Sequence, residues 1–245
     1  MKITVLGKYG PFPNVGGSCS GCLIEHGKAS IVLDMGNGTL SNLLKVKPEL
    51  NIDALLLSSL RSDHMSDALI LRYALLQFKA HGKNVPFPLS VLLPSAPEAQ
   101  FRELSSSGVF DMLRIEDSMR VRFGGLTVTF HQMPQPIPTF ALQIDADGKK
   151  VIYTGDTNIN EKLVTICQKA DILLASACFL SSDKTGDTFP HMTAADAADL
   201  ALKANVKQLI CTHIWGGYTD EHILGEVHKT YPTAIAAQQM HTYLV

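Results

Sequence analysis

The stretch "LLLSSLRSDHMSD", residues 55–67, passes from an apolar segment directly into a cluster of charged and polar side chains. The apolar part predicts a buried strand over 53–58. Asp63 and His64 stand side by side beyond the end of that strand, and Arg61 lies two residues upstream of Asp63. A surface turn can contain the same residues, so the stretch is informative only together with other strand ends.

Two further predicted strands lead to a residue that can bind a metal. "VIYTG" leads to Asp156, and "QLICT" leads to His213. Ligands and catalytic groups collect at strand ends in layered α/β folds. Together with Asp63 and His64, these residues offer two carboxylates and two imidazoles, a donor set suited to zinc or a similar divalent ion. The alternative for each histidine taken alone is a packing residue with satisfied hydrogen bonds.

Length and composition indicate one domain over residues 1–245. The chain is 46% hydrophobic, and no Ser/Gly-rich linker or run of like charges divides it. The net charge of −2 favours neither a nucleic acid nor a membrane as partner, and no apolar run is long enough to span a bilayer. Five cysteines, an odd number, and a start without a signal-peptide core predict a cytoplasmic protein.

Apolar periodicity predicts strands that alternate with helices, as in an α/β fold. Ser66 and Thr193 are expected to begin helices as N-cap residues, and "DADG" (145–148) is expected to form a hairpin turn. The expected strands lie near 2–6, 20–26, 30–34, 53–58, 89–93, 126–131, 139–145, 150–154, 171–176 and 208–212, and the expected helices near 38–47, 66–79, 160–169, 193–204 and 220–230.

These motifs resemble those of the metallo-β-lactamase-fold hydrolases, most closely the small bacterial branch related to ribonuclease Z. The resemblance covers nearly the whole chain, through "ITVLGKYGPFPNVGGSCSG", "IVLDMGNG", "LLLSSLRSDHMSD", "QPIPTFALQI", "VIYTGDTN", "HMTAADAADLA" and "LICTHIWGG" in the family's order. It implies an α/β (α+β) fold, the four-layer αββα sandwich, with a metal site at one edge of two packed sheets.

The resemblance also implies that the family's first metal site is degenerate in this chain. The family motif His-x-His-x-Asp-His reads Ser-Leu-Arg-Ser-Asp-His over 59–64, so Ser59 and Arg61 replace two histidines. The third histidine of that site matches Gln135. This set cannot hold zinc, since a guanidinium is a permanent cation with no lone pair to give.

The family's second metal site is intact by the same resemblance. Its ligands match Asp63, His64, Asp156 and His213, which predict at most one divalent ion. Zinc is expected, manganese or iron are alternatives, and a protein without any ion is the remaining possibility. Such a site leaves room for water, as an open catalytic site requires. Asp34, in "IVLDMGNG", is expected to orient one of the ligands.

His191, in the "HMT" motif, matches a histidine that pairs with a glutamate in the ribonuclease Z-like branch and helps to protonate the leaving group. The position of that glutamate corresponds to about Ser176. We therefore expect the imidazole to lack its carboxylate and to be less well oriented. His131 precedes Gln135 by four residues and is expected to pack or to face solvent.

Arg61 is expected to take the place of the missing first ion. Without that ion, one side of Asp156 would have no partner, and burying an unpaired carboxylate costs several kcal/mol. A guanidinium has a permanent charge and donors shaped for a carboxylate, so we expect it near Asp156 and Gln135. It could also polarise a substrate oxygen there. The alternative is a long side chain that swings out to solvent.

Two functions of different class remain open, because a fold alone does not define a function. One is a metallohydrolase in which Asp63, Arg61 and His191 take part in water-mediated hydrolysis of an ester, lactone or phosphodiester of a small substrate. The other is a catalytically degenerate member that acts as a ligand-binding or interaction module. No insertion matches the arm with which ribonuclease Z grips tRNA, so no tRNA binding is expected. A homodimer is implied by the resemblance alone.

Overall fold

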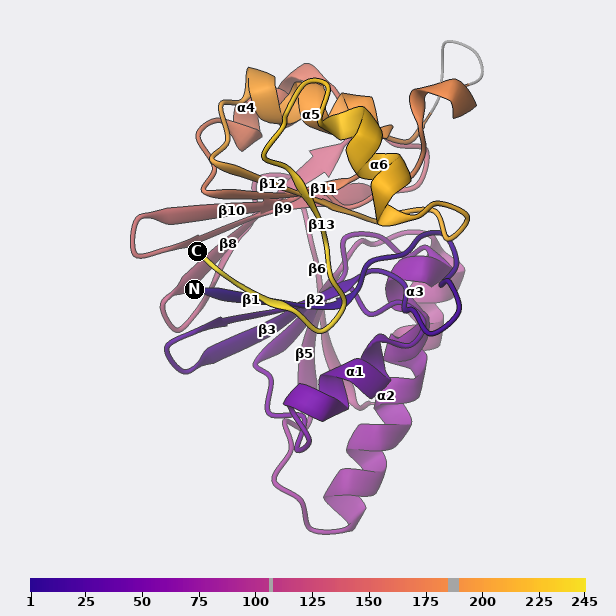
Figure 1. The fold of residues 1–245 in the computed structure, drawn as a ribbon. Helices are drawn as coiled ribbons and strands as arrows, with labels where there is room; N and C mark the ends of the chain where they lie inside the picture. The colour runs from indigo at the N-terminus through magenta and orange to yellow at the C-terminus, as the bar shows by residue number, and fades with distance from the viewer. Residues whose placement is uncertain (106–107, 185–189) are drawn as a thin grey trace.

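Two sheets packed face to face make up the interior of the protein. The computed structural model describes residues 1–105, 108–184 and 190–245. Each sheet has seven strands, and helices cover the outer face of both (Figure 1). The αββα sandwich implied by the resemblance is confirmed.

The first sheet has the strand order β14-β1-β2-β3-β4-β5-β6. Strands β3 to β6 are parallel, whereas β14, β1, β2 and β3 pair antiparallel. The sequences of β3 and β4 have no polar alternation because both faces of the sheet are covered there. The strands are β1 (Lys2–Gly7), β2 (Gly21–His26), β3 (Ala29–Leu33), β4 (Ala54–Leu56), β5 (Leu89–Leu93), β6 (Phe110–Arg114) and β14 (Thr242–Leu244).

The second sheet has the order β13-β12-β11-β10-β9-β8-β7. Its strands β10 to β13 are parallel and β7 to β10 are antiparallel. The predicted hairpin joins β9 to β10 through Asp147 and Gly148, which both have positive φ, as a two-residue turn of this kind requires. The strands are β7 (Arg120–Phe123), β8 (Leu126–Met133), β9 (Thr139–Ala146), β10 (Lys149–Tyr153), β11 (Ile172–Ser176), β12 (Gln208–Thr212) and β13 (Ile235–Ala236).

Of the two helix starts predicted from N-cap residues, one is confirmed and one is wrong. Thr193 caps its helix as predicted, in a reciprocal pair of hydrogen bonds with Asp196. The prediction that Ser66 begins a helix is wrong, because α2 begins one turn earlier, at Ser62. An acidic residue, Asp63, thereby lies in the first turn, where it interacts favourably with the helix dipole. The helices are α1 (Thr39–Val46), α2 (Ser62–Ala80), α3 (Glu98–Ser105), α4 (Glu161–Cys167), α5 (Ala194–Lys203) and α6 (Asp220–Val227), with a 3-10 turn at Ser181–Asp183.

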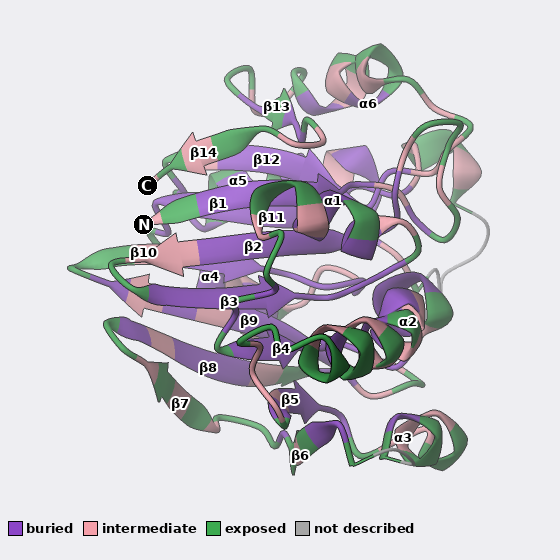
Figure 2. Cartoon of the chain, turned by 90° about the horizontal axis from the view of Figure 1, so that it is seen from below, coloured by how far each residue is buried: buried purple, intermediate pink, exposed green. Residues whose placement is uncertain are grey.

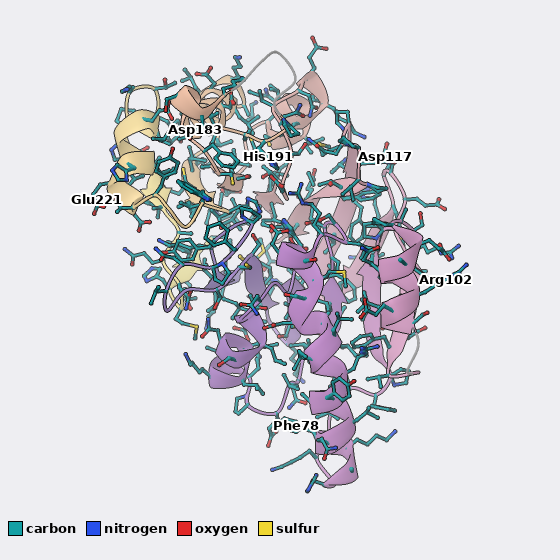
Figure 3. All side chains as sticks on the ribbon, turned by 90° about the vertical axis from the view of Figure 1, so that its right-hand side faces the viewer. Phe78, Arg102, Asp117, Asp183, His191 and Glu221 are labelled. Atoms are coloured by element: carbon teal, nitrogen blue, oxygen red, sulfur yellow. The ribbon has the colours of Figure 1, made fainter. Side chains whose placement is uncertain are left out.

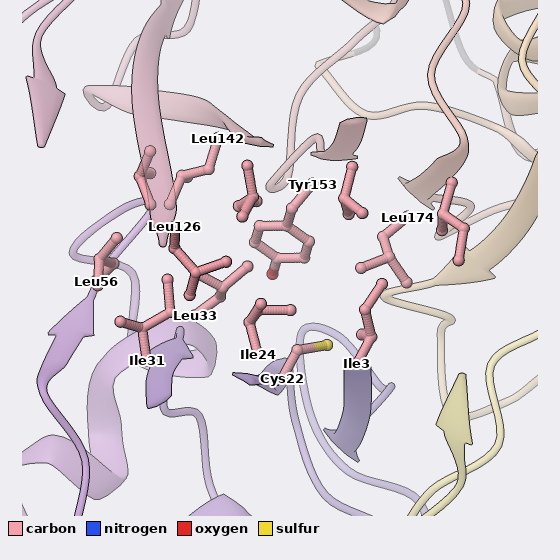
Figure 4. Packing of buried hydrophobic residues seen from close by; sticks show 14 of the residues in the cluster. Ile3, Cys22, Ile24, Ile31, Leu33, Leu56, Leu126, Leu142, Tyr153 and Leu174 are labelled. Carbon is pink, nitrogen blue, oxygen red and sulfur yellow. The ribbon is translucent and has the colours of Figure 1, made fainter. Parts of the chain in front are cut away.

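One core lies between the two sheets, and a further core lies between each sheet and its helices. Figure 2 shows buried strands in the middle of the molecule and exposed outer faces on α2 and α3. Tyr153 packs among the apolar side chains between the sheets, and its hydroxyl points toward the first sheet (Figure 4). Within the described ranges, no helix combines the length and the apolar character that crossing a membrane demands.

An ion-pair cluster around Asp171 stabilises the start of β11. Its carboxylate accepts hydrogen bonds from Lys207 Nζ (2.8 Å), Lys149 Nζ (3.3 Å) and the backbone N–H of Lys150 (2.9 Å). Burial acts to raise the pKa of Asp171, but these hydrogen bonds outweigh it and lower the pKa to about 2. A lowered pKa contributes stability that is present above the unfolded value near 3.9 and is lost as pH falls from about 4 to about 2.

Asp171→Asn is expected to lower the free energy of unfolding at pH 7 by roughly 1 kcal/mol, a modest value because both lysine side chains are exposed. The difference from the parent protein should shrink as pH approaches 3, since the carboxylate then loses its charge in both states. Urea unfolding of the parent protein and the variant at pH 7, 4 and 3 measures this difference in the free energy of unfolding. Asp111→Asn, at an exposed position of β6, is the matched control. Equal unfolding midpoints for Asp171→Asn and the control at every pH would contradict the assignment.

Candidate metal centre

The candidate site lies where strands from both sheets end. Asp34 follows β3, and Asp63 and His64 occupy the first turn of α2 after β4. Asp156 follows β10, and His213 follows β12. The predicted convergence of polar strand ends is therefore present, with contributions from both halves of the chain.

Three of the four predicted ligands form one buried cluster. The potential ligand atoms of Asp63, His64 and His213 all lie within 4.8 Å of one another. His213 Nε2 is 2.9 Å and His64 Nε2 is 3.4 Å from the same oxygen, Oδ2 of Asp63. The two imidazole rings stack, with centroids 5.1 Å apart and an interplanar angle of 20°. His213 has a φ of 52°, a strained conformation of the kind that occurs at functional sites.

Asp34 fixes the orientation of His64, as expected. Its buried carboxylate accepts hydrogen bonds from His64 Nδ1 (2.7 Å), from the Tyr153 hydroxyl (2.6 Å) and from the backbone N–H and hydroxyl of Ser58 (2.6 and 2.7 Å). Because Nδ1 donates to Asp34, Nε2 is the nitrogen turned to the cluster. The sequence did not predict a role for Tyr153, whose only signal is a hydroxyl at the buried end of β10, after Val151 and Ile152.

Opposite charges hold the cluster together when no ion is bound. Burial acts to raise the pKa of Asp63, but His64, His213 and Arg61 outweigh it and lower that pKa. Burial acts to lower the pKa of His213, but Asp156 and the hydrogen bond to Asp63 raise it well above its ordinary value. Burial acts to raise the pKa of Asp156, and His213, His191 and Arg61 lower it to about 2. A metal would therefore have to displace protons from the imidazoles.

The chemistry of the cluster fits one divalent ion. Two imidazoles and a carboxylate are the protein donors of an open catalytic zinc site. The Nε2 atom of His64 is buried and has no hydrogen-bond partner, although a buried polar atom normally has one. The resemblance places Ser59 and Arg61 at two histidine positions of a first metal site, and a hydroxyl and a guanidinium do not replace imidazole ligands there.

Arg61 lies beside Asp156, as expected. Its Nη1 atom is 3.1 Å from Asp156 Oδ2, and its Nε atom is 3.8 Å from Asp63 Oδ1. The Arg61 side chain is 29% exposed and that of Asp156 is fully buried, so the guanidinium compensates a carboxylate that water does not reach. The expected contact with Gln135 is not made: that amide instead donates to the carbonyl of Pro190 (3.0 Å).

His191 has a carboxylate partner, and the expectation that it lacks one is wrong. Its Nδ1 atom is 2.9 Å from Asp156 Oδ1, and its ring packs against Phe179. On the face shown in Figure 3, His191 lies between Asp183 and Asp117. Ser176 is buried on β11, and its hydroxyl has no hydrogen-bond partner. The expectation fails because it assigns Asp156 to a metal alone. His131, as expected, is not near the cluster of ligands and is half-buried on β8.

Comparisons with known proteins agree with this fold. The family described as "Beta-lactamase superfamily domain" matches residues 30–214. The "Probable metallo-hydrolase YhfI" of Bacillus subtilis (strain 168) is 29% identical over 214 residues, which cover 87% of each chain. The crystal structure of "the metallo-beta-lactamase fold protein YhfI" superposes with a TM-score of 0.91 at 26% identity, over 99% of this chain and 98% of that one.

A ribonuclease Z is similar over almost the same extent. The enzyme of Archaeoglobus fulgidus is 25% identical and is aligned over 97% of this chain and 95% of its own. The family match spans well over half of the 245 residues and includes Asp34, Asp63, His64, Asp156 and His213. The chain therefore belongs to the beta-lactamase superfamily and is related to metallo-hydrolases of that superfamily.

Proposed function

We propose that this protein is a metal-dependent hydrolase with a single divalent ion, zinc in the first instance, held by Asp63, His64 and His213. The observation that carries the proposal is the buried Nε2 atom of His64, which has no hydrogen-bond partner and lies 3.4 Å from Asp63 Oδ2 in the cluster with His213. A bound ion would satisfy that nitrogen. The replacement of the first-site ligands by Ser59 and Arg61 supports one ion rather than two.

When bound, a divalent ion supplies Lewis-acid chemistry at a carbonyl or phosphoryl oxygen and makes water more acidic. The residues of the chain have distinct tasks around it. Oδ2 of Asp63 faces the two imidazoles, so the other oxygen, Oδ1, can accept a hydrogen bond from water. Arg61 is partly exposed and can donate to a substrate oxygen that becomes negative during the reaction. His191 can place a proton on the leaving group. We propose a small ester, lactone or phosphodiester as substrate, and no binding of tRNA.

A second function, a binding module without metal, is favoured by one specific observation. The ionisable groups already neutralise one another, with Arg61 and His191 on Asp156 and His213 on Asp63. Such a set is stable without an ion and could hold an anionic ligand through Arg61. Measurement of bound metal separates the two functions.

We expect one equivalent of zinc per chain after dialysis against metal-free buffer, measured by elemental analysis, together with turnover of a generic phosphodiester or lactone. His213→Ala should abolish the binding, because it removes one of two nitrogen ligands. His131→Ala is the matched control and should keep the full equivalent. Two equivalents in the parent protein would refute a single-ion site. A protein that ignores added zinc would instead support the binding module.

A further inference from the structure

Both oxygens of Asp156 face charged or polar side chains of the protein. Oδ1 accepts a hydrogen bond from His191 Nδ1 at 2.9 Å, whereas Oδ2 has no hydrogen-bond partner and lies 3.1 Å from Arg61 Nη1 in an ion pair. The side chain of this carboxylate is fully buried, so its charge is balanced by these two neighbours and not by water. By family resemblance this residue would bridge two ions. Here a guanidinium and an imidazole occupy the two positions around it.

The geometry also sets Asp156 apart from the ligand cluster. His213 faces Asp63 through Nε2, at 2.9 Å, whereas Asp156 Oδ1 is 3.9 Å from the opposite nitrogen, Nδ1. An imidazole binds an ion through one nitrogen in the plane of its ring. The nitrogen of His213 that would hold an ion together with Asp63 and His64 is therefore Nε2, and Asp156 faces the other nitrogen of that ring. The fixed charge of Arg61 beside Asp156 would also repel a second cation.

One change in the role of Asp156 then accounts for both residues that differ from the family pattern, Arg61 and Ser176. Arg61 replaces a metal-binding histidine, which releases Asp156 from the role of a bridging ligand. Ser176 replaces the glutamate that would orient His191, and its hydroxyl makes no hydrogen bond. The released carboxylate takes over that orienting task, as the hydrogen bond to His191 indicates.

We propose that Asp156 is not a metal ligand and that it belongs to a separate Arg61–Asp156–His191 triad, in which it is the positioning residue for His191. This inference rests on the proposed function for its catalytic meaning. Asp156 holds the proton of His191 on Nδ1, so Nε2 is the nitrogen that exchanges a proton with a substrate. Arg61 balances the buried charge of the carboxylate through its ion pair with Oδ2.

Zinc affinity tests the first half of the proposal. The affinity is measured on the full chain by competition with a chromophoric chelator. Asp156→Asn should change the dissociation constant by no more than about threefold, whereas Asp63→Asn, the matched substitution at a ligand, should raise it by roughly 100-fold or more. Equal losses in the two variants would make Asp156 a ligand and overturn the proposal.

The tautomer of His191 tests the second half and needs neither activity nor a bound metal. In ion-free protein labelled with 15N-histidine, His191 should carry its proton on Nδ1, with the signal assigned by its loss in His191→Gln. One equivalent of zinc should change the signals of His64 and His213 but leave His191 in the same tautomer. If zinc instead moves the His191 proton from Nδ1, Asp156 has been drawn to the metal and the proposal is wrong.

Two variants complete the test. Asp156→Asn should lower the population of the Nδ1–H form, and Ser176→Ala should leave it unchanged. An unaltered His191 tautomer in Asp156→Asn would overturn the proposal, and the measurement on the parent chain decides the matter if that variant does not fold. Should no form of the protein bind zinc, the proposed hydrolase fails, while the tautomer measurement still decides whether the triad exists.

Discussion

Asp34→Ala should lower the free energy of unfolding by roughly 4 kcal/mol, a large part of the stability of a typical domain. The Asp34 carboxylate is buried and accepts four hydrogen bonds, from Ser58, His64 and Tyr153. Truncation removes the acceptor that these donors share, and each buried group left without a partner costs about 1–3 kcal/mol. Urea unfolding followed by circular dichroism measures the loss.

The same substitution should weaken zinc binding by about 10- to 100-fold, because the ring of His64 loses the hydrogen bond that orients its Nε2 atom toward Asp63 and His213. Asp117→Ala is the matched control. Asp117 is exposed and pairs with exposed Lys162, so its removal should cost at most about 1 kcal/mol and leave zinc binding intact. If Asp34→Ala unfolds at the same urea concentration as the control, the hydrogen-bond network does not stabilise the fold.

Gly10→Ala should abolish most of the zinc affinity, by roughly 100-fold or more, although Gly10 is not a ligand. A methyl group at this position would lie 2.2 Å from His213 Nε2 and within 2.5 Å of two further ring atoms. The ring cannot easily move aside, because it is buried, bonded to Asp63 and stacked on His64. Overpacking of this kind should also cost about 1–3 kcal/mol of stability.

Gly225→Ala is the control for Gly10→Ala. A methyl group on Gly225, within α6, would meet no atom within 4 Å, so alanine there should raise stability by roughly 0.5–1 kcal/mol through its helix propensity. Zinc binding should be unchanged. A Gly10→Ala protein with the parent affinity for zinc would mean that His213 is free to shift without losing the ion.

The strands that the sequence predicts are those with an apolar or alternating run. β8 was predicted from its alternation of apolar and polar residues and β12 from its apolar run, and most residues of both strands are buried. The short edge strands were missed, because β6 is mostly exposed and has no clean alternation. β14 is only three residues long, and its pairing with β1, which is distant in the sequence, is fixed by tertiary structure.

The residues of the candidate site could be predicted from the sequence, but the contacts among their side chains could not. Polar residues at strand ends identified Asp63, His64, Asp156 and His213, because the topology of layered folds brings such ends together. The pairing of His191 with Asp156 depends on side-chain rotamers. It also depends on Arg61, which pairs with Oδ2 of Asp156 and leaves Oδ1 to His191. The Tyr153 hydroxyl reaches Asp34 across the interface of the two sheets, a contact that neither strand reveals in its own sequence.

The pairing of β14 with β1 has a consequence for the order in which the protein can be completed. Thr4 lies opposite Thr242, and their hydroxyl groups are 2.8 Å apart, so the chain comes back to its starting strand (Figure 1). During synthesis on the ribosome, β1 emerges before the other strands of its sheet, but its outer edge gains this partner only after residues 242–244 have been made. Until then the nascent chain presents an open sheet edge, to which another chain could add.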